Sequence, residues 1–270
     1  METPTEARFE ARGLDSDDDR SWFRVGRDAG YIAGVGFLVT TVLYLLDAAN
    51  ILGLEATFRR TSAGATQDEA NFWAAQFAHM HRILWDVIAR DTIGPLAWVA
   101  LIVLGLAIRR IAGANRPGTQ LMALFLLVGG VLQITNSLLY LGDVEFWRIT
   151  GWSGHPNPVA MVAVGRASVA IGNLTLWPEA FGYLVLAAGL VCLGRLCRSS
   201  DELPSQLGAL AYSEAALITG AGIAEMLHAG NAQNVLLLVV GVLLGPAIAF
   251  WLARRFQRLA RGQTSDRGAA

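Results

Sequence analysis

Ionisable and amide side chains recur at helical spacing inside apolar stretches of this 270-residue chain. Glu214 and Glu225 are eleven residues apart, so on a helix they share a face about 16 Å apart along the axis. A carboxyl group inside a bilayer is costly unless it faces water or a partner, and several can share one cavity. We therefore expect a polar pocket whose ligand or proton pathway comprises Asp47, Gln133, Asn136, Tyr140, Glu214, Glu225 and His228.

The residue types in this pocket suit proton transfer and ligand binding. A stripe of carboxyl groups on one helix, here Glu214 and Glu225, is what a proton relay needs, and Asp47 of the first span is the third carboxyl group expected to take part. Asn136 and Tyr140 would orient a ligand by hydrogen bonding. For Asp47 and Glu225 the alternative is an interfacial position from which the side chain reaches water. Glu179, together with Tyr183 one turn further on, could join the pocket.

Histidines raise the question of a metal. Glu225 and His228 are three apart, a spacing found in di-iron bundles, but those need a second such pair and further glutamates, which the sequence lacks. A metal site built from His81, Glu225 and His228, with His155 as a further candidate, is therefore the weaker hypothesis. Ordinary hydrogen-bonded histidines are favoured, and no cofactor is assigned.

Six apolar stretches must position these residues. A hydrocarbon core of roughly 30 Å needs about 20 apolar residues in a helix, and each stretch supplies that number or nearly so. The hydrophobic share of 54% against 16% charged residues also exceeds what soluble proteins show. The fold class is therefore an all-α polytopic membrane bundle with spans at Gly30–Leu52, Thr92–Ile111, Gln120–Leu141, Pro178–Leu196, Gln206–His228 and Val235–Ala253.

The distribution of arginine predicts the orientation of the bundle. All 21 basic residues are arginines, which indicates a GC-rich, bacterial coding bias. Most of them flank the spans on the side that both termini share. Because positive charge is retained in the cytoplasm, both termini are predicted to be cytoplasmic and the protein to lie in the plasma (inner) membrane.

The spans and their charges divide the chain into three regions. Residues 1–29 contain an acidic run and five arginines without an apolar core, which predicts a partly disordered cytoplasmic tail and not a signal peptide. Residues 30–254 form the transmembrane domain, with outer loops at 53–91 and 142–177. Residues 255–270 form a second cytoplasmic tail. Pro158–Ile171 is too short for a seventh span and carries Arg166, so a re-entrant or interfacial segment is expected there.

The two outer loops carry aromatic and amphipathic features. Asp68–Arg90 is predicted to form an amphipathic helix that lies on the membrane or caps the bundle, with His81 and Trp85 as lid residues. The second outer loop is rich in tryptophan, notably Trp147, Trp152 and Trp177. These residues indicate an aromatic belt at the interface or, alternatively, a stacking surface for a lipid, quinone or other flat ligand.

Small residues, short turns and proline predict how the spans pack. Short turns make spans two and three, and spans five and six, antiparallel neighbours. Gly30-x-x-x-Gly34 and Gly241-x-x-x-Gly245 offer flat faces for close helix approach. Pro246 is expected to kink the sixth span, because it removes a backbone donor.

Neither a nucleotide-binding fingerprint nor a hydrolase or zinc-protease motif is present, so the sequence leaves open whether the protein is an enzyme. A net charge of −1 gives no reason to expect nucleic acid as a partner. The favoured hypothesis is small-molecule or proton-coupled transport, or ligand binding, through an outward-facing pocket. The alternatives are an enzyme acting on a lipid-like substrate at the outer face, with His228 or Glu225 as general base, and a non-catalytic subunit of a membrane complex. The lipid bilayer is the expected environment, and a homo-oligomer or a partner subunit is possible.

Overall fold

The computed structural model describes residues 17–48, 65–82, 84–150, 157–200 and 203–261. Every regular element within these ranges is a helix. The elements are α2 (Asp17–Ala48), α3 (Ala65–Arg82), α4 (Leu84–Ala112), α5 (Pro117–Thr150), α6 (Pro158–Ser199), α7 (Ser205–Met226), α8 (Gly230–Val239), the π-helical segment η1 (Val240–Leu244) and α9 (Gly245–Ala260).

Six helical segments of the described chain are long and apolar enough to cross a membrane. They are α2, α4, α5, α6, α7 and the uninterrupted run of α8, η1 and α9. The predicted all-α bundle with six spans is thereby confirmed, and the chain is a multi-pass membrane protein. Only α3 among the described helices is not a span.

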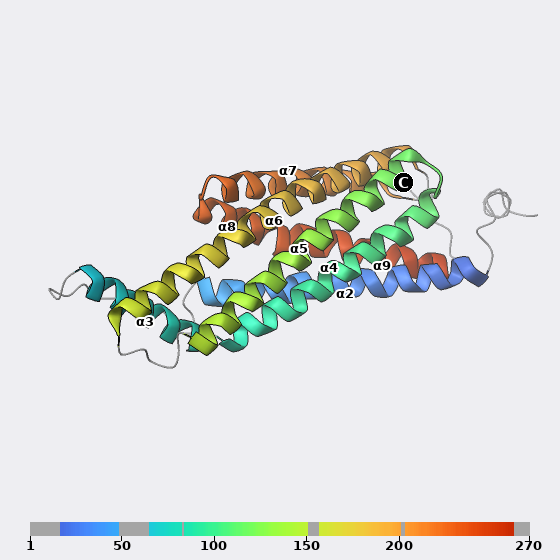
Figure 1. Cartoon of the computed structure of the whole chain (residues 1–270). Coiled ribbons are helices and arrows are strands. Elements are labelled where there is room, and N and C mark those ends of the chain that lie inside the picture. The colour runs from blue at the N-terminus through green and yellow to red at the C-terminus, as the bar shows by residue number, and fades with distance from the viewer. Residues whose placement is uncertain (1–16, 49–64, 83, 151–156, 201–202, 262–270) are drawn as a thin grey trace, which may run out of the picture.

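The spans lie side by side as one bundle (Figure 1). α2 packs between α4 and α9, α5 packs between α4 and α6, and α6 packs against α7. The start of α2 and the end of α9 lie at the same end of the bundle, here called the terminal end (Figure 1). α3 lies at the opposite end, here called the α3 end. An even number of spans accounts for this arrangement.

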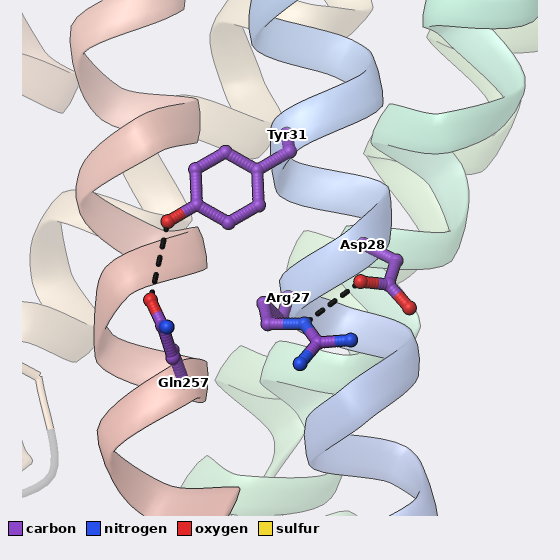
Figure 2. Close-up of polar contacts among 4 residues, drawn as sticks. All are labelled: Arg27, Asp28, Tyr31 and Gln257. Carbon is purple, nitrogen blue, oxygen red and sulfur yellow. Dashed lines mark hydrogen bonds and ion pairs between the residues drawn. The ribbon is translucent and has the colours of Figure 1, made fainter.

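Helix α2 packs closely against α9 because its glycines leave room. A Cβ atom on Gly30 would lie 2.9 Å from the Ala249 carbonyl oxygen, and one on Gly34 would lie 2.6 Å from the Phe250 ring. Small residues at such contacts let two helices approach closely, as the Gly-x-x-x-Gly spacing predicts. Figure 2 shows the polar contact beside this seam, where the Tyr31 hydroxyl donates to Gln257 Oε1 at 3.2 Å.

Pro246 distorts the last span, as expected, but through a π-helical segment. Proline has no N–H to donate to the preceding turn, and its ring crowds that turn. The backbone widens over Val240–Leu244, and the Gly245 N–H donates to the Val240 carbonyl oxygen. Gly241 in this segment lies directly against Thr41 of α2, where a side chain would clash. The second Gly-x-x-x-Gly pair therefore also serves helix packing.

The region predicted as the N-terminal tail is helical from Asp17 onward. Asp19 is fully buried, and its Oδ1 lies 2.8 Å from Nε of Arg110 on α4. Acidic residues in the first turn also complement the positive end of the helix dipole. These partners stabilise a helix in residues 17–29, whereas the division of the chain into a tail of residues 1–29 and a transmembrane domain stays a prediction. At the other terminus, α9 continues past residue 254 to Ala260. Residues 1–16 and 262–270 lie outside the described residues.

The predicted outer loop 142–177 is largely helical. α5 continues to Thr150, and α6 begins at Pro158 and runs through Pro178 without a break. The Asn157 side chain caps α6 by accepting a hydrogen bond from the Val159 N–H at 2.9 Å. Pro158–Ile171 is therefore the first part of the 42-residue α6 and not a re-entrant segment. Trp152 lies outside the described residues.

The predicted amphipathic helix Asp68–Arg90 is divided between two elements. α3 ends at Arg82 and α4 begins at Leu84, so the second half of the predicted helix is the start of a span. The predicted single helix Asp68–Arg90 is wrong in its bounds, because an amphipathic run followed by an apolar run does not reveal where one helix ends and the next begins. Residues 84–91 of the predicted outer loop 53–91 accordingly belong to helix α4.

Candidate functional site

A cavity of about 500 Å³ lies between the spans. Its polar lining belongs to residues of α2, the start of α4, the middle of α5 and of α6, α7 and the start of α8. Most of these positions are near the α3 end, while apolar side chains line the rest. The polar members are Thr40, Thr41, Tyr44, Arg90, Asp91, Gln133, Asn136, Ser137, Tyr140, Thr175, Glu179, Tyr183, Glu214, Glu225, Gln233 and Asn234.

Glu179 of α6 is the centre of the hydrogen-bond network in this lining. Asn136 Nδ2 of α5 donates to its Oε2 at 3.2 Å. The Tyr183 hydroxyl and Gln233 Nε2 of α8 donate to its Oε1 at 3.0 Å and 3.2 Å. All three donors are neutral, and hydrogen bonds to a carboxylate favour its charged form. The geometry therefore fits an anionic Glu179 shared by three helices.

A second group of contacts lies between α2, α4 and α8. The Tyr44 hydroxyl donates to Asn234 Oδ1 at 2.6 Å. The guanidinium of Arg90 lies 5.5 Å from the centre of the Tyr44 ring, and its Nε lies 3.2 Å from Asp86 Oδ2. A cation over an aromatic face is held by the quadrupole of the ring. The Arg90 guanidinium is thus held in place by both Asp86 and the Tyr44 ring.

Glu214 of α7 is the deepest carboxyl group in the cavity wall. The residue is only 7% exposed, and its Oε2 has no hydrogen-bond partner among the described residues. Gly245 lies opposite, where an added Cβ would be 3.3 Å from Glu214 Oε1. A buried, unpartnered carboxyl is expensive when charged, so it is suited to bind a proton or a cationic ligand.

The structure brings five of the seven predicted pathway residues to the cavity, namely Gln133, Asn136, Tyr140, Glu214 and Glu225. Gln133 contributes by donating from Nε2 to the Glu179 carbonyl oxygen at 3.0 Å. Asp47 belongs to α2, but its side chain lies outside the described part of the chain. His228 is not part of the lining.

His228 lies outside the cavity lining because helix α7 ends before this residue. The residue has a φ of 54°, the left-handed conformation typical of a helix C-terminus. Its N–H donates to the Glu225 carbonyl oxygen at 2.9 Å, and the Ala229 N–H donates to Ala224 at 2.8 Å. This hydrogen-bond pair is a Schellman motif. The predicted shared helical face of Glu225 and His228 is therefore wrong, and the general-base role considered for His228 has no geometric support.

The lid residues His81 and Trp85 also lie away from the cavity. Both are exposed, Trp85 to 82%, and neither belongs to the lining. Helix α3 instead packs against the first part of α6, where Trp73 covers Gly165, and its Phe77 contacts the Trp147 ring of α5. Arg166 holds Glu69 there through two contacts of 2.9 Å and 2.8 Å. Trp73 and Trp147 thus serve packing, while Trp85 and Trp177 stay on the surface.

The described residues give no support to a metal site at His81, Glu225 and His228. Within the described ranges, no three histidine, cysteine or acidic side chains come together in a way that could hold a metal ion. His81, Glu225 and His228 do not converge, and His155 lies outside the described residues.

A separate buried polar cluster joins α5 to α6 outside the cavity. Trp147 Nε1 donates to Ser168 Oγ, which in turn donates to Asp143 Oδ1 at 3.1 Å. Both Asp143 and Ser168 are buried. No histidine belongs to these contacts, so the cluster fits a structural role in joining the two helices near the tryptophans.

Several cavity residues were not predicted from the sequence. Gln233 and Asn234 were assigned to the turn before the last span, although they form the first helical turns of α8. Arg90 falls at the end of the predicted amphipathic helix Asp68–Arg90, and Asp91 at the end of the predicted outer loop 53–91. Their positions in the sequence could have indicated this. Each of them adjoins an apolar run at the side of the membrane where Asn136, Tyr140 and Glu225 are also expected.

Comparisons of the chain with protein-family models, with characterised proteins and with solved structures find no match. The class of protein therefore follows from the fold and the site themselves: a six-span membrane protein with a cavity between its spans. The cavity is polar toward the α3 end and contains a deeper buried carboxyl group.

Proposed function

We propose that this protein moves a small molecule across the membrane and couples the movement to protons. The observation that supports this most directly is Glu214, a buried carboxyl group without a hydrogen-bond partner in the wall of a cavity of about 500 Å³. A cavity of this size fits a small-molecule ligand. An ionisable residue inside a span that faces a cavity is typical of ion and proton pathways.

Glu214 can exchange a proton without disturbing a structural ion pair. It forms none among the described residues, and its Oε2 has no hydrogen-bond partner there. The other titratable groups of the lining are Tyr44 of α2, Arg90 and Asp91 of α4, Tyr140 of α5, Glu179 and Tyr183 of α6, and Glu225 of α7. Protonation of Glu214 would thus change the charge of the cavity while these groups keep their contacts.

The orientation and location of the protein are part of the proposal. Arginine at the terminal end supports cytoplasmic termini in the plasma membrane of a bacterium. The polar part of the cavity, at the α3 end, then faces the exterior. A ligand would enter from that side, pass the network around Glu179 and reach Glu214.

Reconstitution into liposomes tests the proposal. The vesicles carry a pH gradient and are incubated with a mixture of small molecules, and their contents are identified by mass spectrometry. We expect gradient-dependent accumulation with the unaltered protein, and its loss in Glu214→Gln. The matched control is Glu145→Gln, because Glu145 is an exposed carboxyl group of α5 outside the cavity. Unchanged accumulation in Glu214→Gln, or accumulation that ignores the gradient in every variant, contradicts the proposal.

A further inference from the structure

The charges in the cavity lining are unbalanced toward the negative. Four carboxyl residues line the described cavity, Asp91, Glu179, Glu214 and Glu225, against one guanidinium, that of Arg90. Arg90 is already engaged, since its Nε lies 3.2 Å from Asp86 Oδ2 and its guanidinium lies over the Tyr44 ring. Within the described chain, Glu179, Glu214 and Glu225 form no ion pair. The lining therefore contains more acidic groups than the protein itself pairs with positive ones.

Glu179 is held by hydrogen bonds but has no positively charged partner among the described residues. Its three hydrogen-bond donors, Asn136, Tyr183 and Gln233, are all neutral. They orient the carboxylate and stabilise its charge, but they add no positive charge. The carboxyl groups of Glu225 and Asp91 lie close enough to interact electrostatically with it. This part of the cavity would attract a cation and repel an anion.

The remainder of the cavity offers an apolar and aromatic environment. Leu104, Leu126, Leu186 and Ile218 line it together with Phe37 and Trp98. The Phe37 and Trp98 rings meet edge to face, with centroids 4.6 Å apart. Such walls take up the apolar body of a ligand, and aromatic faces also favour cations. The ligand that matches both parts has a positive group attached to a hydrophobic body.

We propose that the cavity binds an organic cation, with its positive group beside Glu179 and Glu225 and its apolar body among the leucines and Trp98. This inference rests on the proposed transport function and specifies its substrate class. Glu214, with its unpartnered Oε2, lies further along the same wall and remains available to a proton while the cation occupies the polar part.

Two probes of opposite charge test the inference in detergent solution. Tetraphenylphosphonium and tetraphenylborate have nearly the same size and shape, so the sign of their charge is what distinguishes them. Equilibrium dialysis of the full chain at neutral pH should show saturable binding of the phosphonium and at least about tenfold weaker binding of the borate, as expected for like-charge repulsion in a partly desolvated site. Equal affinity, or preference for the borate, overturns the inference.

Variants of the cavity lining identify which carboxyl group binds the phosphonium. Glu179→Gln, which keeps the shape of the side chain, should weaken phosphonium binding about tenfold or more, because a charge contact is lost. Glu145→Gln should leave it unchanged. Since Glu179 also joins three helices, Glu225→Gln provides a second variant that removes cavity charge without removing a hydrogen bond of that network. If neither cavity variant weakens binding, the inference is wrong.

The outcomes separate this inference from the proposed function. Phosphonium carries a charge that does not titrate, so any pH dependence of its binding comes from the protein. Selective phosphonium binding together with gradient-independent transport would contradict proton coupling and leave the cation site standing. Gradient-dependent transport lost in Glu214→Gln, with no preference between the two probes, would contradict the cation site alone.

Discussion

Gln233 Nε2 lies 3.2 Å from Glu179 Oε1 and donates a hydrogen bond to it, which joins α8 to α6 at the polar part of the cavity. The two residues are 54 positions apart in the chain. The same carboxyl group accepts from Asn136 of α5. One acidic side chain therefore connects three spans, and the contacts of the cavity wall also hold the bundle together. Ligand binding and stability should respond together when these contacts are altered.

Removing one donor from Glu179 tests this connection. Tyr183→Phe deletes the hydroxyl that donates to Glu179 Oε1 at 3.0 Å and leaves the ring in place. We expect the free energy of unfolding to fall by about 1.5–3 kcal/mol, the usual contribution of a hydrogen bond to a charged group. Denaturation in detergent, followed by circular dichroism, measures the change.

The control for this variant is Tyr212→Phe. The Tyr212 ring lies 4.9 Å from the Arg198 guanidinium, a contact that phenylalanine can keep. Tyr212 is not part of the cavity lining. We expect the free energy of unfolding of the Tyr212→Phe variant to differ from that of the unaltered protein by less than about 0.5 kcal/mol. A similar loss of unfolding free energy in Tyr183→Phe and Tyr212→Phe would contradict a stabilising role for the Tyr183–Glu179 hydrogen bond.

Replacing Glu214 with an apolar residue should stabilise the protein. Glu214→Met fills nearly the same volume and removes a buried oxygen that has no hydrogen-bond partner. We expect the free energy of unfolding to rise by about 1–3 kcal/mol, the cost of a buried unsatisfied polar group. Transport should be lost in the same variant, since functional polar groups are commonly retained at the expense of stability. Thermal unfolding in detergent and the liposome assay measure the two effects, and a less stable Glu214→Met would contradict the prediction.

Two glycines of α5 provide a matched pair for helix packing. A Cβ on Gly129 would lie 2.6 Å from Leu186 Cγ and 3.0 Å from the Leu186 backbone nitrogen. Gly129→Ala should therefore separate α5 from α6 and lower the unfolding free energy by about 1–3 kcal/mol. Gly142→Ala meets no atom within 4 Å and should be neutral or stabilise by about 0.5–1 kcal/mol through helix propensity. Comparison of the two unfolding temperatures checks the prediction, which fails if Gly142→Ala is the more damaging change.

The attachment of α3 should weaken in acid. The hydrogen bond from Arg166 lowers the pKa of Glu69 below its ordinary value. A carboxyl group with a lowered pKa contributes its stabilisation above the pKa of the unfolded chain and loses it as the pH falls through the lowered value. The protection factors of the α3 amides, which compare their exchange with that of an unstructured chain at the same pH, should therefore fall below about pH 4, near the ordinary pKa of glutamate.

Arg166→Gln is the control for this acid effect. In that variant α3 should exchange faster at neutral pH and show less additional change in acid, because the partner of Glu69 is absent. Arg148→Gln should leave α3 exchange unaltered, since Arg148 pairs with Glu145 within α5. Equal protection factors of the α3 amides at neutral and acid pH in the unaltered protein would rule out this role for the pair.

The sequence by itself determined the solvent and the helical class of this protein. An apolar run of membrane-spanning length is a local property that can be read without knowing any neighbour, so six spans were predictable. Polar residues such as Glu214, Gln133 and Asn136 stand out against that background for the same reason. The helix ends were less predictable. α6 runs through Pro178, and His228 adopts the left-handed conformation after α7, because capping and packing decide these points.

Only the tertiary structure decided which side chains meet. Glu179 becomes the centre of the cavity network because Asn136 and Gln233 reach it from other helices, and no spacing within one helix encodes that meeting. α3 packs on α6 and not over the cavity because Gly165 leaves room for the Trp73 ring and Arg166 pairs with Glu69. Such partners come from distant parts of the chain, and the packing of whole helices selects them.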